Sequence, residues 1–466
     1  MTRKALFVPS ALICFLLSLS LSANAQIAAS QPAPAVSIEK LAGTWDARII
    51  PMTKHGVGAL EVPFGLSIEV PAGGNARAGI LNGPERMEFS SVAWDGTILT
   101  LRLEQYDGQI TARCDATARE LTGEYARQTR AGIGKYGFRA KRANSETGST
   151  QPWAAATVSG EWAVTFPYEE GNPDRVAPAT FRQETPHTSS DGKTLQAVVT
   201  GTIAPVSGDY GLMSGTVSVP LANGKPVANV APKVVMSRFD GIHTILLTGE
   251  LASDGSFKGQ LAFSASSWLP FTGVRKPESA KSGAASAGNP PDAETMTKVK
   301  NRAEPFVFSG VDTRTGKSVT QDDFRGKAVI VDIFGTWCPN CHDEAPLLVE
   351  LYRRYHEQGL EIVALSYEYT ADASRNARVI EVYRKKFDIP FTLLLAGTTD
   401  AGQIEKTLPQ LVGFGAYPTT IFIGRDGRVQ RIHAGFAGPS TGQFEELERR
   451  FDRNVQELLQ TGEARK

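Results

Sequence analysis

The stretch that decides the fold runs from Lys327 to Pro346 and reads KAVIVDIFGTWCPNCHDEAP. Its first part, residues 328–334, is apolar and rich in β-branched side chains between two glycines, which predicts a buried strand. Beyond Cys338 the apolar residues recur at helical spacing, and Gly359 fits just past a helix end. Cys338 and Cys341 therefore lie where a strand meets a helix N-terminus. Unpaired backbone N–H groups and the helix dipole favour a thiolate there, and thiolate is the nucleophile in disulfide exchange.

The segment Trp337-Cys338-Pro339-Asn340-Cys341 resembles the Trp-Cys-x-x-Cys motif of thioredoxin-like proteins. Together with Phe334-Gly335-Thr336 before it, and Glu344 and Pro346 after it, the motif resembles the TlpA/ResA type of exported thiol-disulfide oxidoreductase. The resemblance covers roughly the last third of the chain. It implies that Cys338 is the exposed nucleophile, that Cys341 resolves the mixed disulfide, and that the pair forms a redox-active disulfide without a cofactor. A zinc site would need a second pair of ligands, and none follows, so no metal is predicted.

A second motif, Tyr417-Pro418-Thr419-Thr420, resembles the cis-proline loop of the same proteins. The resemblance implies that this loop packs against the cysteine pair. Its residues Tyr417 and Pro418, with Trp337, Pro339 and Asn340, would then contact an extended substrate. An ordinary trans proline at the start of a strand is the alternative.

Two acidic residues are candidates for the proton acceptor of the resolving thiol. Asp332 lies six residues before Cys338, at the position of the buried carboxylate of thioredoxin. Glu368 follows the next apolar strand and nearly matches the acid that many TlpA/ResA-type proteins use instead, although Tyr369 fits that place equally well. We expect burial to raise the pKa values of both Cys341 and Asp332, which makes Asp332 the favoured acceptor. A solvent-facing Asp332 is the alternative.

His342 directly follows the pair. A charged imidazole there would favour the thiolate, and a solvent-facing residue of the first helical turn is the equal alternative.

The remaining chain predicts a multidomain protein. Residues 1–25 have a positive start, an apolar run and Ala23-Asn24-Ala25, which is typical of an export signal, so we expect a bacterial periplasmic or envelope location. Left uncleaved, this segment would anchor the protein to the membrane. Lys and Arg together number 49, as do Asp and Glu, so no net charge draws the protein to nucleic acid.

Residues 36–142 and 153–276 read as two related all-β antiparallel modules, each a small barrel or sandwich. Both open on a Gly-x-Trp segment, at Trp45 and Trp162, which resembles the start of lipocalin-like barrels. Cys114, the odd cysteine, is expected to be a small apolar group of the first module. Residues 277–298 are rich in Ser, Ala, Gly and Pro and predict a flexible linker. Residues 299–466 alternate strands and helices in the order of a thioredoxin-like domain.

The leading hypothesis is an exported thiol-disulfide oxidoreductase whose partners are disulfide-containing envelope proteins and a membrane or periplasmic redox partner. A peroxiredoxin-like peroxidase is one alternative, although Thr336 lies two residues before Cys338 and that family's pattern places its Thr or Ser three before. An envelope protein that binds a ligand or partner through its β modules, with an accessory redox domain, is the other.

Overall fold

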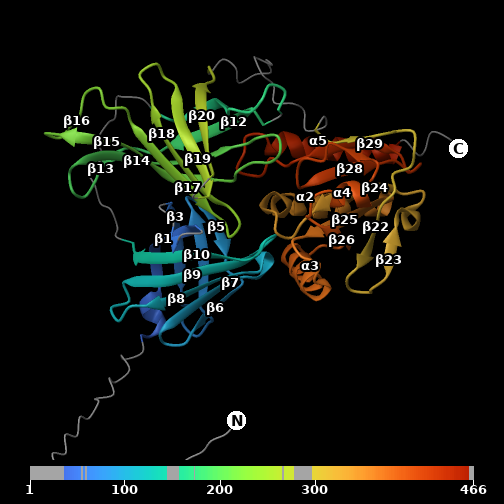
Figure 1. The fold of residues 1–466 in the computed structure, drawn as a ribbon, viewed down its shortest axis with the longest axis horizontal. Helices are drawn as coiled ribbons and strands as arrows, with labels where there is room; N and C mark the ends of the chain where they lie inside the picture. Colours follow the sequence, from blue (N-terminus) through green and yellow to red (C-terminus); the bar gives the residue numbers. More distant parts are fainter. Residues whose placement is uncertain are drawn as a thin grey trace, which may run out of the picture. The chain divides into compact units, whose positions relative to one another are not determined.

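The computed structural model describes residues 36–53, 56–57, 60–143, 157–172, 174–264, 267–277 and 296–460 (Figure 1). The predicted export signal and nearly all of the predicted linker lie outside the described residues. Figure 1 draws the first β module in blue and cyan, the second in green and the α/β domain in yellow to red. Among the described residues, no helix combines the length and hydrophobicity that crossing a bilayer requires.

The first β module is one antiparallel sheet that curls without closing. Its path runs β5-β4-β3-β1-β10-β9-β8-β7-β6, so β5 and β6 are its two edges. Alternate side chains of these strands face one apolar core, which includes Cys114. The strands are β1 (Gly43–Thr53), β2 (Gly56–Val57), β3 (Val62–Glu69), β4 (Arg77–Asn82), β5 (Glu85–Glu88), β6 (Ser91–Trp94), β7 (Ile98–Leu103), β8 (Gly108–Cys114), β9 (Glu120–Thr129) and β10 (Gly132–Arg142), with the short helices η1 (Ile38–Leu41) and η2 (Glu104–Tyr106).

The second β module closes into a barrel. Its sheet follows the order β13-β14-β12-β11-β20-β19-β18-β17-β15-β16, and a further pairing of β14 with β15 joins the ends. Closure leaves few unpaired backbone groups at an edge. The strands are β11 (Gly160–Thr165), β12 (Val176–Gln183), β13 (His187–Thr188), β14 (Thr194–Ile203), β15 (Met213–Ala222), β16 (Lys225–Pro226), β17 (Lys233–Phe239), β18 (Thr244–Leu251), β19 (Phe257–Ser264) and β20 (Ser267–Arg275).

The two opening tryptophans occupy equivalent positions in the two modules. Trp45 and Trp162 are fully buried and lie opposite Arg142 and Arg275 of the closing strands. Each indole N–H donates to the carbonyl oxygen four residues earlier, at 3.0 Å for Trp45 and 2.9 Å for Trp162. Each arginine lies over its indole ring, at 4.8 and 4.6 Å from the ring centre. The repeated sequence therefore builds the same plug at one end of each module.

The end of β17 and the turn after it join the modules, because Phe239, the last residue of β17, belongs to the core of the first module. The Phe239 ring lies 4.7 Å from that of Phe64. Its backbone pairs with the Asn82 side chain through bonds of 2.9 and 3.2 Å. The Tyr125 hydroxyl donates to the carbonyl oxygen of Gly241 in the same turn. The open first module is thus filled by its neighbour, which the sequence analysis did not predict.

The α/β domain has a seven-stranded sheet in the order β23-β22-β26-β25-β24-β28-β29. The central β24, β25 and β26 are parallel, and β28 runs antiparallel to β24. One face of β24 packs with α2, α3 and α5, and the other contributes Val329, Val331 and Ile333 to a second core. This is the predicted thioredoxin-like domain.

Its elements are β21 (Lys298–Val299), β22 (Ser309–Asp312), β23 (Ser318–Thr320), η4 (Gln321–Phe324), β24 (Ala328–Phe334), α2 (Pro339–Tyr355), η5 (His356–Gln358), β25 (Leu360–Glu368), α3 (Ala373–Phe387), β26 (Thr392–Thr398), α4 (Gln403–Thr407), β27 (Leu411–Val412), β28 (Thr419–Ile423), β29 (Val429–Ala434) and α5 (Phe444–Gln460).

Candidate redox site

The two cysteines lie at the N-terminus of α2, as predicted. Cys338 is the N-cap residue, Pro339 is the first residue of the helix, and the backbone N–H of Cys341 donates to the Cys338 sulfur at 3.3 Å. Both are free thiols, with exposed fractions of 4% for Cys338 and 1% for Cys341. Both thiols are buried, so Cys338 is not the exposed nucleophile that the resemblance implies, and Cys341 is the more deeply buried of the two. Burial first, then the hydrogen bond and charge of Cys338, raise the pKa of Cys341 well above its ordinary value.

The Tyr417–Pro418 peptide bond is cis, which confirms that expectation. The Cys338 thiol donates to the carbonyl oxygen of Tyr417, with the two atoms 3.5 Å apart. The loop before β28 therefore lies directly against the first cysteine.

Aromatic rings line this side of the cysteine pair. The Trp337 ring stacks on Tyr369 at 4.7 Å and meets Tyr417 edge-on at 5.1 Å. Its indole N–H donates to the carbonyl oxygen of Tyr367 at 2.9 Å. Of the predicted substrate-contacting residues, Tyr417 bonds Cys338 and Trp337 packs on Tyr417, while Pro339 and Pro418 are the chain neighbours of Cys338 and Tyr417. Asn340 lies apart from these aromatic rings and faces the second β module, where a side chain at Gly208 would overlap the Asn340 amide.

Glu368 is fully buried and well bonded. One carboxylate oxygen accepts from the backbone N–H of Thr336 at 3.0 Å and from the Ser366 hydroxyl at 2.7 Å. The other accepts from the Thr336 hydroxyl at 2.9 Å and from the Arg375 guanidinium at 3.3 Å. These bonds hold the residue two positions before Cys338, so they fix the backbone that presents the thiol.

Asp332 is buried at 3% exposure, on the sheet face that packs against α2. Its partner is Glu344 of α2, whose carboxylate accepts from the Thr420 hydroxyl at 2.5 Å. Burial first, and the charge of Glu344 second, raise the pKa of Asp332 well above its usual range, in the direction predicted. Burial also raises the pKa of Glu344, to about 7. Burial thus favours the protonated form of both carboxyls, and the two titrate as a pair.

Residues 299–432 match the AhpC/TSA family. The thiol-disulfide oxidoreductase ResA of Bacillus thuringiensis subsp. konkukian is 33% identical over 136 residues, which are 29% of this chain and 69% of that protein. ResA of Geobacillus thermodenitrificans is 30% identical over 142 residues, which are 30% of this chain and 72% of that protein. The chain belongs to the ResA-like thiol-disulfide oxidoreductases.

Among solved structures, a thiol:disulfide interchange protein of the thioredoxin family from Chlorobium tepidum is 25% identical, with a TM-score of 0.27. The match covers 34% of this chain and 99% of the Chlorobium chain. The AhpC/TSA match lies within the α/β domain, so the two β modules are outside it.

The sequence alone predicted no role for two side chains of this ResA-like site, Glu344 and Tyr383. Glu344 stood out only as part of the motif, although its place three residues after Cys341 puts both on one helix face. Tyr383 of α3 donates its hydroxyl to the carbonyl oxygen of Cys341 at 2.8 Å. Only the packing of α3 on α2 brings Tyr383 there, so no local pattern predicts it.

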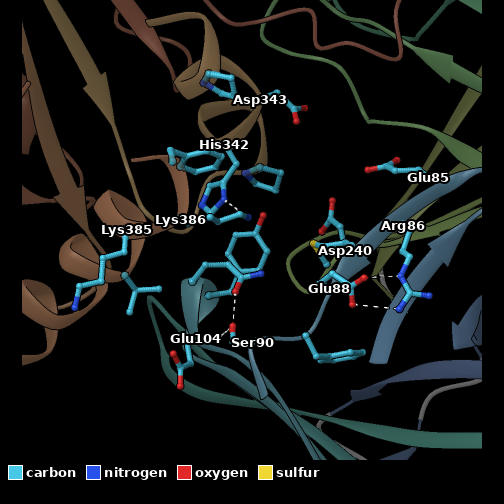
Figure 2. A pocket seen from close by; sticks show the side chains of 18 of the residues that line it. Glu85, Arg86, Glu88, Ser90, Glu104, Asp240, His342, Asp343, Lys385 and Lys386 are labelled. Carbon is cyan, nitrogen blue, oxygen red and sulfur yellow. Dashed lines mark hydrogen bonds and ion pairs between the residues drawn. The ribbon is translucent and has the colours of Figure 1, made fainter. Parts of the chain in front are cut away.

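Both expectations for His342 were wrong. Its ring is buried between Tyr106 and Tyr383, 4.8 and 5.0 Å from those rings, so it does not face solvent. Its Nε2 lies 2.8 Å from the carbonyl oxygen of Thr336, and its Nδ1 lies 3.0 Å from the Lys386 ammonium (Figure 2). Burial first, and the Lys386 charge second, lower its pKa well below the ordinary value. A neutral imidazole that donates from Nε2 and accepts at Nδ1 satisfies both contacts.

The described residues hold no group of three or more His, Cys, Asp and Glu side chains that could bind a metal ion.

Proposed function

We propose that this thiol-disulfide oxidoreductase exchanges disulfides through Cys338 and Cys341, and that it is exported. The observation that carries the proposal is a cysteine at the N-cap of α2, against a cis-proline loop, with a buried carboxyl pair on the same side of the sheet as the second cysteine. The features of residues 1–25 support export to the periplasm or envelope.

In the reducing direction, the Cys338 thiolate attacks one sulfur of a substrate disulfide. A Cys338–substrate disulfide forms, and the other substrate sulfur leaves as a thiolate. Cys341 then loses its proton and attacks the Cys338 sulfur. The Cys338–Cys341 disulfide forms, and the second substrate thiolate leaves. Two electrons have passed from the protein to the substrate, and the oxidising direction is the exact reverse.

The buried carboxyl pair supplies the acceptor for the Cys341 proton. Asp332 was the expected acceptor, and Glu344 lies beside it with its pKa also raised by burial. We therefore assign the accepting function to the pair as a unit. The oxygens of Glu368 already accept hydrogen bonds from Thr336 in the loop before Cys338, which favours a positioning role for Glu368.

Disulfide exchange by single-cysteine variants tests the proposal. Cys338→Ser should abolish attack on a model peptide disulfide, and Cys341→Ser should stop the reaction at the mixed disulfide. Exchange at the parental rate in either variant would rule the proposal out. Substrates would be disulfide-containing envelope proteins, and a membrane or periplasmic partner would restore the starting redox state.

Peroxidase chemistry receives no specific support, because the Thr336 hydroxyl is already bonded to Glu368. Peroxide consumption that survives in Cys341→Ser would nevertheless favour it.

A further inference from the structure

A loop of the second β module covers part of the redox site. This loop, residues 204–212, joins β14 to β15 and is called here the barrel loop. Its Gly208 faces Asn340, one of the two residues between the cysteines, so closely that a Cβ on Gly208 would lie 1.9 Å from the Asn340 amide nitrogen. A side chain at residue 208 would require the Asn340 side chain to shift, and the φ of +136° at Gly208 also favours glycine.

The barrel loop also bonds the segment that follows β29. The backbone N–H of Asp209 donates to the carbonyl oxygen of Phe436 at 3.3 Å, and the Asp209 carboxylate accepts from the backbone N–H of Gly438. A Cβ on Gly435 would lie 2.2 Å from the carbonyl oxygen of Val206. Main chain thus meets main chain along this contact, as it would with an extended substrate segment.

The first module makes a second contact beside the site. Asp107, directly after η2, accepts from Arg375 at 3.1 Å and from Arg378 at 3.0 Å, both on α3. The same Arg375 also bonds Glu368, so one polar chain runs from the first module to the loop before Cys338.

The two polar contacts flank a cavity, whose lining includes Tyr106 of the first module packed on His342 of α2. Its volume is about 770 Å³, and its walls come from both β modules, from α2 and from α3. Figure 2 shows His342 and Asp343 of α2 on one side of it and Glu85 and Asp240 of the β modules on the other. The Asp343 and Asp209 carboxylates converge on Gly438, where a Cβ would lie 2.7 and 3.0 Å from them. An interface that contains a cavity and two converging carboxyl groups suits contacts that separate.

We propose that Asn340 and the segment Phe436–Gly438 form the face on which substrate proteins dock, and that the barrel loop occupies this face as an intramolecular competitor. The proposal rests on the proposed function. A substrate protein reaches Cys338 when the barrel loop and the Asp107 contact release together, whereas small thiol reagents reach it without release.

Alkylation of Cys338 in the full-length reduced protein tests this, with peptide mass spectrometry following Cys338 alone. N-ethylmaleimide and a maleimide on a long polyethylene glycol chain carry the same reactive group but differ in size. We expect the large reagent to react much more slowly with the parent. Asp209→Ala and Asp107→Asn should each speed the large reagent about tenfold, since each removes hydrogen bonds to a carboxylate, and should change the small one less than about twofold.

Asp191→Ala is the matched control, because it removes another loop aspartate of the second module that accepts backbone N–H bonds. It should leave both rates unchanged. Asp107→Asn keeps the experiment decisive if Asp209→Ala does not fold, because Asn tolerates the left-handed backbone of residue 107. Equal rates for both reagents in the parent, or an unchanged ratio of rates in the variants, would overturn the proposal. Alkylation needs no disulfide exchange, so failure of the proposed function would show separately in Cys338→Ser.

Discussion

Two sets of buried carboxylates flank the cysteine loop, and they differ in how well their oxygens are satisfied. Both oxygens of Glu368 accept two hydrogen bonds each. In contrast, Asp332 and Glu344 each keep one buried oxygen without a hydrogen-bond partner among the described residues. A buried carboxyl oxygen without a donor favours the protonated form of its group, in line with the raised pKa values of Asp332 and Glu344. Burial alone therefore does not make an acid a proton acceptor; the number of donors around it decides.

The strongest test of this contrast is a pair of matched substitutions. Glu368→Gln breaks a buried ion pair with Arg375 and should lower the free energy of unfolding by about 3–5 kcal/mol. Glu344→Gln removes no ion pair and should lower it by less than about 1 kcal/mol at pH 7. Urea denaturation of both variants measures their free energies of unfolding. Equal losses of stability in the two variants would contradict the distinction between Glu368 and the Asp332–Glu344 pair.

The next largest effect concerns Asp332 and Glu344 and the rate at which Cys341 resolves the mixed disulfide. Asp332→Asn should leave the attack by Cys338 unchanged and slow the attack by Cys341 by about 10²-fold, because the proton acceptor is impaired. Mixed disulfides with a model substrate should then accumulate and can be counted by mass spectrometry. Glu344→Gln should act similarly, and the double variant should be less than additive. If Glu368→Gln slows resolution while Asp332→Asn does not, Glu368 is the acceptor.

The pH dependence of the unfolding free energy should also distinguish Glu344 from Glu368. The pKa of Glu344 is about 7 in the folded chain, above its ordinary value of 4.5, so the folded state holds the extra proton between these values. That contribution is complete below about pH 4.5 and is lost as pH rises through about 7. The free energy of unfolding should thus fall by roughly 2 kcal/mol more between pH 5 and 8 in the parent than in Glu344→Gln. Identical pH profiles would refute the raised pKa. Asp343, whose pKa burial raises to about 8, is common to both proteins and cancels in the comparison.

The smallest expected effect concerns Tyr383, which bonds the Cys341 carbonyl oxygen. Tyr383→Phe removes one buried hydrogen bond and should cost about 1 kcal/mol in unfolding free energy. Resolution should slow less than in Asp332→Asn, because the proton acceptor remains. Stopped-flow kinetics of the mixed disulfide would show this, and a larger effect than that of Asp332→Asn would move Tyr383 into the proton-transfer step.

Much of the α/β domain and its site follows from local pattern. The apolar run 328–334, the cysteine spacing and Pro418 each depend on a few adjacent residues, and the structure places all three where the sequence predicts. The pairing of Glu344 with Asp332 does not follow in this way, since it needs the distance between a strand and the helix packed on it. His342 was misjudged for the same reason: its surroundings come from η2 and α3, far away in the chain.

The sequence by itself determined the strand–cysteine–helix unit and the positions of the Pro418 loop and of the repeated Trp45 and Trp162, because periodicity and turn chemistry act over a few residues. The structure decided that the Tyr417–Pro418 bond is cis and that both tryptophans are buried. Only the tertiary structure decided that Phe239 fills the first module, that Glu368 is a brace, and that Gly208 lies on Asn340. The contacts of Phe239 and Gly208 join residues that are more than a hundred positions apart. The role of Glu368 depends on how many hydrogen-bond donors surround its buried carboxylate. Such quantities exist only once the chain has packed.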